Sequence, residues 1–102
     1  MKIKEIIWLK EFADKIEWKH GVTEDEVDEV LDKQPPVRKM ARGSRQGEDL
    51  YRAIEQTNAG RYLSIFFIYK GRERALVISA RDANAKELKS YARQKKQNKR
   101  TS

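Results

Sequence analysis

The stretch VISARDANAKELKSYARQKKQNKR, Val77 to Arg100, changes abruptly from apolar to basic residues. Its apolar run stops at Arg81, and Asn84 with Glu87 three residues later has the pattern of a helix N-cap and its reciprocal glutamate. The stretch therefore predicts a buried strand that is followed at once by a capped helix. An arginine at such a junction is held in position by both elements, which makes Arg81 a candidate ligand for a phosphate group.

The segments before this junction predict a sheet. Tyr62–Tyr69 is almost continuously apolar and aromatic, as expected of a central strand that is covered on both faces, and a hairpin connects it to a strand over residues 73–80. Leu50–Gln56 alternates between two faces and predicts a third strand. A short edge strand is expected over residues 37–40.

The N-terminal third predicts one strand, over residues 2–8, and two helices. The first helix ends at Gly21, and the second begins with a capping box of Thr23 and Glu26. The expected fold is α+β, with an N-terminal strand and two helices, an antiparallel sheet of about four to five strands, and a C-terminal helix. The residues expected to pack the last helix on the sheet are Ala85, Leu88 and Ala92, with Tyr91 beside them.

Length and composition indicate one small domain. A chain of 102 residues with 38% hydrophobic residues can build a modest core, and we expect a domain over residues 1–94 and a flexible basic tail over residues 95–102. With no cysteine and one histidine, neither a metal site nor a cofactor is expected. The chain begins with too many charges for a signal peptide and has no apolar stretch long enough for a membrane span, which favours a cytoplasmic protein.

The positive charge of the chain is unevenly distributed. The formal net charge is +7, yet residues 1–34 carry six Lys or Arg against ten Asp or Glu, residues 35–80 carry nine against four, and residues 81–102 carry eight against two. A basic surface favours a polyanion such as nucleic acid as partner, whereas the acidic second helix is expected to face away from it. The alternative is that the charge only keeps a small domain soluble.

Three stretches occur in an order and at a spacing that are informative together. They are KHGVTEDEVDEVL (Lys19 to Leu31), AGRYLSIFF (Ala59 to Phe67) and ISARDANAKELKSY (Ile78 to Tyr91). This combination resembles the BrnT family of toxins, which share the RelE-like ribonuclease fold. The resemblance implies a toxin that cleaves RNA and a co-expressed antitoxin, usually a ribbon-helix-helix DNA-binding protein. Through such an antitoxin the toxin would be bound to operator DNA indirectly.

The expected reaction is metal-independent cleavage of RNA, with mRNA as the expected substrate and a block of translation as the result. The 2′-hydroxyl attacks the adjacent phosphorus, so the protein has to align the backbone, offset charge on the phosphoryl oxygens and help to move a proton. Arg81 is the first candidate for offsetting charge, because its planar fork can hold two phosphate oxygens. The alternative is an ion pair with a neighbour such as Glu55 or Glu87.

Other side chains are candidates for catalysis or RNA binding. Arg52 is unusual on a partly apolar strand face, unless it lies at the rim of the sheet. A histidine can act as a general acid or base, which makes His20 a candidate, but His20 and Lys19 can equally cap the last carbonyls of the first helix. Tyr91 is expected to pack on the sheet, although RelE-like nucleases often place such a tyrosine near the scissile phosphate. The candidates for RNA binding are Arg61, which can also be an ordinary turn cation, Lys86, Lys89 and Arg93.

Two functions without catalysis remain open. The charge is compatible with a nucleic-acid-binding module, because the sequence offers no convincing triad, metal cluster or glycine loop for phosphate. Alternatively, the acidic helix over Glu24–Asp32 and the basic sheet together dock a bipolar antitoxin.

Overall fold

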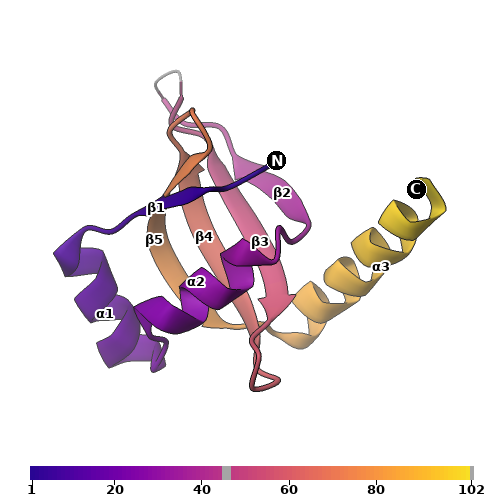
Figure 1. Ribbon diagram of the computed structural model, residues 1–102, viewed down its shortest axis with the longest axis horizontal. Helices are drawn as coiled ribbons and strands as arrows, with labels where there is room; N and C mark the ends of the chain where they lie inside the picture. The colour runs from indigo at the N-terminus through magenta and orange to yellow at the C-terminus, as the bar shows by residue number, and fades with distance from the viewer. Residues whose placement is uncertain (45–46, 102) are drawn as a thin grey trace.

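The chain folds into a sheet with helices on its faces, as Figure 1 shows. The computed structural model describes residues 1–44 and 47–101, with residues 98–101 described by their backbone alone. Its elements are β1 (Glu5–Ile7), α1 (Lys10–His20), α2 (Glu24–Asp32), β2 (Val37–Ala41), β3 (Leu50–Gln56), β4 (Tyr62–Tyr69), β5 (Arg74–Asp82) and α3 (Ala85–Thr101). This order confirms the predicted α+β arrangement.

The strands form one mixed sheet in the order β1-β5-β4-β3-β2. From β2 to β5 each neighbouring pair is antiparallel, whereas β1 lies parallel to β5. The four strands from β2 to β5 confirm the predicted antiparallel sheet, and β1 adds a parallel strand at its edge. No hairpin ties β1 to its neighbour, because α1 and α2 carry the chain from β1 to the opposite edge of the sheet, and its direction is not constrained by a tight turn.

One face of the sheet carries the core, which α1 and α2 cover (Figure 1). Val27, Val30 and Leu31 on α2 are fully buried, as the apolar stripe of that helix predicts. The strands contribute alternate residues to the same face, as the period of two requires. The core consists of Ile3, Ile16, Val22, Val27, Val30, Leu31, Ala53, Leu63, Ile65, Phe67, Ala75, Val77 and Ala80.

The junction between α1 and α2 follows the signals in the sequence. Gly21 ends α1 in the left-handed conformation, with φ of 63°, and its N–H donates to the carbonyl of Glu17 at 2.9 Å. Thr23 and Glu26 then form the predicted capping box, in which the Glu26 N–H donates to Thr23 Oγ1 at 3.2 Å and the Thr23 N–H donates to Glu26 Oε1 at 3.1 Å. The two helices are thus set at a fixed angle over the sheet.

The last helix differs from its prediction in two respects. α3 continues to Thr101 through residues assigned to a flexible tail, since Lys, Gln and Arg are good helix formers, and it projects past the sheet (Figure 1). Ser102 of that predicted tail lies outside the described residues. Ala85 and Ala92 are exposed, while Glu87 is buried against the sheet. No helix in the described part of the chain is long and apolar enough to cross a membrane.

The left-handed residue between α1 and α2 should set a measurable part of the stability. Nothing lies within 4 Å of a Cβ added to Gly21, so the cost of a side chain there is conformational. We expect Gly21→Ala to lower the free energy of unfolding by about 1 kcal/mol in a denaturant titration. Gly21→Asn is the matched control and should lose less, because asparagine tolerates this conformation. Equal losses in both variants would contradict this explanation.

Candidate active site

Arg81 lies on the face of the sheet opposite the core, and a β-bulge in β5 puts it there. Phe66 pairs with Ser79 while Phe67 pairs with Val77, so Ile78 is an extra residue in β5. Without this bulge Arg81 would point to the same side as the buried Val77, four residues earlier. Arg81 is instead paired with Ser64, on the side where α3 begins.

The guanidinium of Arg81 makes a bidentate ion pair with Glu87. Nη1 and Nη2 donate to the two carboxylate oxygens at 2.7 and 2.8 Å. The guanidinium also lies 5.3 Å from the ring centroid of Phe66, at cation–π distance. One third of the Arg81 side chain, 34%, remains exposed to solvent. Arg81 therefore lies at the predicted junction of strand and helix, and it also makes the ion pair that was the predicted alternative.

Glu87 is the carboxylate that connects the start of α3 to the arginines on this face of the sheet. Its N–H donates to Asn84 Oδ1 at 2.8 Å and its Oε1 accepts from the Asn84 N–H at 2.9 Å, which confirms the predicted cap of α3. Burial acts to raise the pKa of Glu87, but hydrogen bonds from Arg81 and from the Asn84 backbone outweigh it and leave the pKa below its usual value. The carboxylate is therefore ionised at neutral pH.

Arg52 is buried on β3 with few partners for its charge. Its side chain is only 8% exposed; Nη2 donates to Ser90 Oγ at 3.3 Å, and Nη1 is 4.0 Å from Glu87. Nε is buried and has no hydrogen-bond acceptor within the described residues. Burial lowers the pKa of Arg52. Arg52 and Arg81 therefore share one carboxylate, so this cluster carries a net positive charge.

Tyr91 belongs to a second polar cluster, one helical turn further along α3. Its hydroxyl donates to Glu55 Oε2 at 2.7 Å, and Lys95 Nζ contacts Glu55 Oε1 at 3.0 Å. The ring packs edge-on against Tyr62, with 5.7 Å between centroids. Burial raises the pKa of Tyr91, and the carboxylate of Glu55 adds to this shift. The hydroxyl therefore keeps its proton at neutral pH.

Arg61 lies in a separate cluster of polar groups, beside the junction between α1 and α2. Its Nε donates to Asp82 Oδ1 at 2.6 Å, its Nη1 to the carbonyl of Gly21 at 2.8 Å, and its Nη2 to the carbonyl of His20 at 3.1 Å. The guanidinium also contacts Glu26 at 3.3 Å. Arg61 thus connects β5 to the C-terminal end of α1 and to the first turn of α2. Most of its N–H groups donate to protein acceptors.

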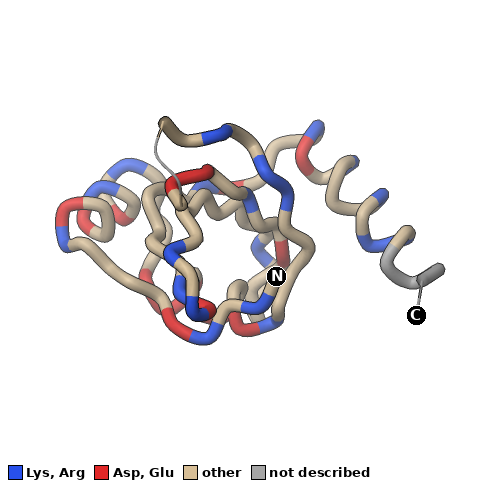
Figure 2. Tube along the Cα trace, turned by 90° about the horizontal axis from the view of Figure 1, so that it is seen from above, with Lys and Arg blue, Asp and Glu red and all other residues tan. Residues whose placement is uncertain are grey.

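The remaining candidates divide between the two sides. His20 is half-buried and Lys19 is exposed at the end of α1, beside the Arg61 cluster and not among the partners of Arg81. Lys86, Lys89 and Arg93 are exposed on α3, where Figure 2 shows Lys and Arg positions along the helix. The structure therefore brings Arg52 and Arg81 together and places Tyr91 next to them on α3.

Sequence reasoning named both acids of these clusters but did not show which cations each one holds, and it missed the hydroxyl of Ser90 that accepts from Arg52. Glu87 was recognised as a cap and as one possible partner, but its role in joining Arg81 and Arg52 depends on the contact between strands and helix. Glu55 was named as the other possible partner of Arg81, but its carboxylate instead accepts a hydrogen bond from Tyr91 and contacts Lys95 on α3. Only the packing of α3 against the sheet could have shown this.

Removing the charge of Glu87 should destabilise the protein in a pH-dependent way. Because its folded pKa lies below the ordinary 4.5, the ionised group stabilises the fold above that pH, and this contribution is lost as pH falls through the folded pKa. We expect Glu87→Gln to lower the free energy of unfolding by about 2 kcal/mol at pH 7. Denaturant titrations from pH 7 to 3 should show the difference from wild type shrinking on the acid side. A difference independent of pH would contradict the assignment.

Comparison with known proteins places this geometry in a family. The model of the family described as "Ribonuclease toxin, BrnT, of type II toxin-antitoxin system" matches residues 8–87. The crystal structure of the Brucella abortus ribonuclease toxin, BrnT, superimposes with a TM-score of 0.57 at 23% identity and covers 78% of this chain and 96% of that one. No curated protein matches the sequence. The matched range extends from Trp8 to Glu87 and thus includes Arg52, Arg61 and Arg81. The chain belongs to the BrnT family of ribonuclease toxins from type II toxin–antitoxin systems.

Proposed function

We propose that the chain is a metal-independent endoribonuclease that cleaves mRNA in the cytoplasm and so blocks translation. The observation that carries this proposal is the pair of arginines, Arg81 and Arg52, on the single carboxylate of Glu87. Two guanidinium groups against one acid leave positive charge where a phosphate can bind, next to a neutral hydroxyl on α3. Membership of a family of ribonuclease toxins supports RNA as the substrate.

In this proposal Arg81 holds the scissile phosphate. Only Nη1 and Nη2 of its guanidinium donate to protein acceptors in the described residues, and the side chain is partly open to solvent. The Nε–H and the exposed edge can therefore donate to phosphoryl oxygens while Glu87 keeps the group in place. Arg52 adds positive charge from beneath the site, where burial weakens screening by water. Both effects favour the extra negative charge of the transition state.

Tyr91 is the proposed proton donor to the 5′-oxygen that leaves. Its raised pKa keeps the hydroxyl protonated, and its place one turn after Glu87 puts it on the same side of α3. Glu55 and Lys95 fix the hydroxyl before RNA binds. We assign no step to His20 or Lys19, because both lie at the end of α1 beside the Arg61 cluster.

Replacing Arg81 should slow RNA cleavage strongly, whereas removing a positive charge elsewhere should not. We expect Arg81→Ala to reduce the rate of cleavage of a long mRNA in EDTA by about 100-fold or more, because the charge on the phosphoryl oxygens is no longer offset. Wild type should leave fragments with 5′-hydroxyl ends. Arg72→Ala, in the exposed hairpin between β4 and β5, removes the same charge elsewhere and should cut normally. Normal cleavage by Arg81→Ala would refute the assignment.

A nucleic-acid-binding module without catalysis is the alternative function. It predicts that the wild-type chain binds RNA in a salt-dependent way but produces no fragments, with or without ribosomes. The same assay therefore separates the two functions when binding is measured beside cleavage.

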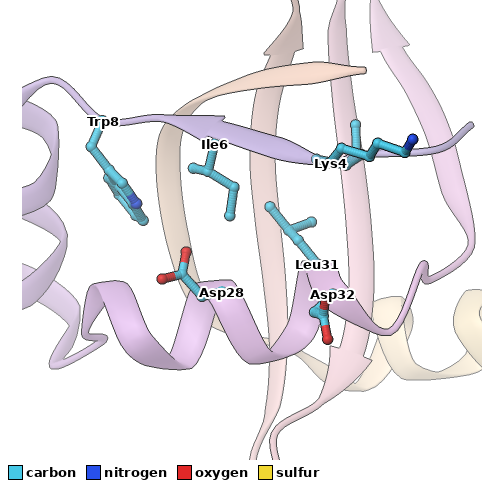
Figure 3. A pocket seen from close by; sticks show the side chains of 7 residues that line it. Lys4, Ile6, Trp8, Asp28, Leu31 and Asp32 are labelled. Atoms are coloured by element: carbon cyan, nitrogen blue, oxygen red, sulfur yellow. The ribbon is translucent and has the colours of Figure 1, made fainter. Parts of the chain in front are cut away.

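We further propose that the cognate antitoxin, a ribbon-helix-helix protein that also binds operator DNA, docks on the opposite face. A cleft of about 270 Å³ between β1 and α2, which we call the β1–α2 cleft, favours this position. Figure 3 shows Ile6 and Leu31 pointing into the space between the two elements, with Trp8 and Asp28 facing one another at one end. The lining residues are Ile3, Lys4, Ile6, Trp8, Asp28, Leu31 and Asp32.

The charge around this cleft indicates the chemistry of the docking segment. Asp25, Asp28, Glu29 and Asp32 line an adjoining hollow on the outer side of α2. Partial burial of the Asp28 carboxyl raises its pKa, and the nearby charge of Asp25 adds to the shift. A segment that combines an apolar side chain with lysines or arginines would fill the cleft and relieve this repulsion.

Charge reversal on α2 should weaken the toxin–antitoxin complex without affecting cleavage. We expect Asp28→Lys with Asp32→Lys to reduce the affinity for the antitoxin at least 10-fold in calorimetry, because both positions would then repel a basic segment. RNA cleavage by the free double variant should stay at the wild-type rate. The double variant Glu11→Lys with Glu17→Lys, at exposed positions on α1, changes the net charge by the same amount and should bind the antitoxin normally. Unchanged affinity in the α2 variant would place the antitoxin elsewhere.

A further inference from the structure

A second cleft lies between the edge strand β2 and α3, and its lining is basic and polar. It has a volume of about 290 Å³ and is lined by Arg38, Ser90, Arg93, Gln94 and Gln97. We call it the β2–α3 cleft. No carboxylate is among these lining residues. At one end Gln94 Nε2 donates to the carbonyl of Val37 at 3.3 Å, so an amide of α3 ties the helix to the strand.

Two arginines of this region are placed where like charges repel. Arg38 on β2 is the direct cross-strand partner of Arg52 on β3, so both side chains emerge on the same face of the sheet. Like charges opposite one another destabilise a strand pair. The charge of Arg38 is among the causes that lower the pKa of Arg52, after burial, whose effect is the largest. This arrangement is unfavourable for the free protein and becomes favourable with an anion between the charges.

Arg52 links the cleft to the candidate active site. Its Nη2 donates to Ser90 Oγ, and Ser90 lines the cleft. The residue is 93% buried, and its Nε has no acceptor within the described part of the chain. Its nearest acid, Glu87, is 4.0 Å away and already holds Arg81 with both oxygens. A buried guanidinium with an unused donor costs free energy that a bound anion would recover.

We propose that the β2–α3 cleft binds a second phosphate of the RNA backbone, next to the one that is cleaved at Arg81. The proposal rests on the proposed function and adds to it a binding site for the flanking nucleotide. Arg38 and Arg93 line the cleft and Arg52 is joined to it through Ser90, so that phosphate oxygens can meet guanidinium forks from β2 and from α3. Ser90 and the two glutamines supply further hydrogen-bond donors for the phosphate oxygens.

The proposed phosphate site in the β2–α3 cleft would contribute to RNA binding but not to the chemical step. A phosphate in the β2–α3 cleft is not the one that reacts, so its contacts are the same in the ground state and in the transition state. Its loss should raise KM with little change in kcat, whereas loss of Arg81 should lower kcat. A purely structural role for Arg38 and Arg93, both exposed, predicts neither effect.

The test measures binding of an oligonucleotide that cannot be cleaved. A fluorescent RNA with 2′-O-methyl groups is titrated with wild type and with the double variant Arg38→Ala and Arg93→Ala, by anisotropy at several salt concentrations. We expect the variant to lose at least 10-fold in affinity and to reduce the salt slope by about 1 to 2. The double variant Lys70→Ala and Arg72→Ala removes two charges from the β4–β5 hairpin and should bind within about 2-fold of wild type. Circular dichroism should show that all variants are folded.

Each outcome decides the proposal. Wild-type affinity and salt slope in the cleft variant would overturn it, and so would equal losses in the two double variants. Absence of binding by wild type would overturn both this proposal and the nucleic-acid function. If wild type binds through the cleft but cuts no RNA in the separate cleavage assay, the proposed catalysis fails and the phosphate site stands.

Discussion

A single buried carboxylate, Glu87, holds together the parts of the fold that form the candidate active site. Together with Asn84 it caps α3, and its carboxylate accepts hydrogen bonds from both terminal nitrogens of Arg81 on β5. It also provides the nearest negative charge to Arg52 on β3. Without it two buried or half-buried guanidinium groups would face each other across β4 with no acid between them. The start of α3 and the position of Arg81 are therefore fixed by the same interaction.

The bulge in β5 explains why this interaction is possible. Val77 is buried in the core, and a regular strand would direct Arg81 to that same side. The extra residue, Ile78, shifts the alternation so that Arg81 emerges beside α3. Bulges are known to redirect side chains near functional sites, and here a core strand delivers a cation to the opposite face.

Interactions between residues close in the chain could be predicted from the sequence, whereas contacts between distant segments could not. Local signals were reliable: Gly21, the Thr23–Glu26 box and the Asn84–Glu87 cap all lie where the sequence placed them. Signals that depend on distant partners were not. The parallel pairing of β1, the bulge and the contact of Glu55 with α3 result from how strands and helices meet, and the period of the sequence does not encode them.

The two sides of the molecule also differ in charge, as the uneven sequence indicated. α2 presents Asp25, Asp28 and Asp32 beside the β1–α2 cleft, while the opposite face brings Arg38, Arg52 and Arg81 near α3. RNA and a basic antitoxin segment would thus be attracted to different surfaces. In this arrangement inhibition by the antitoxin would not require that it copy the charge of RNA.

The cleavage rate of Arg81→Lys, measured beside its free energy of unfolding, tests most directly whether Arg81 binds the reacting phosphate. Lysine keeps the charge and one contact with Glu87 but lacks the planar fork that grips phosphate oxygens. We expect the free energy of unfolding to stay within about 1 kcal/mol of wild type while cleavage in EDTA falls by about 100-fold. A stable Arg81→Lys protein that cuts RNA at the wild-type rate would contradict the claim that Arg81 binds the reacting phosphate.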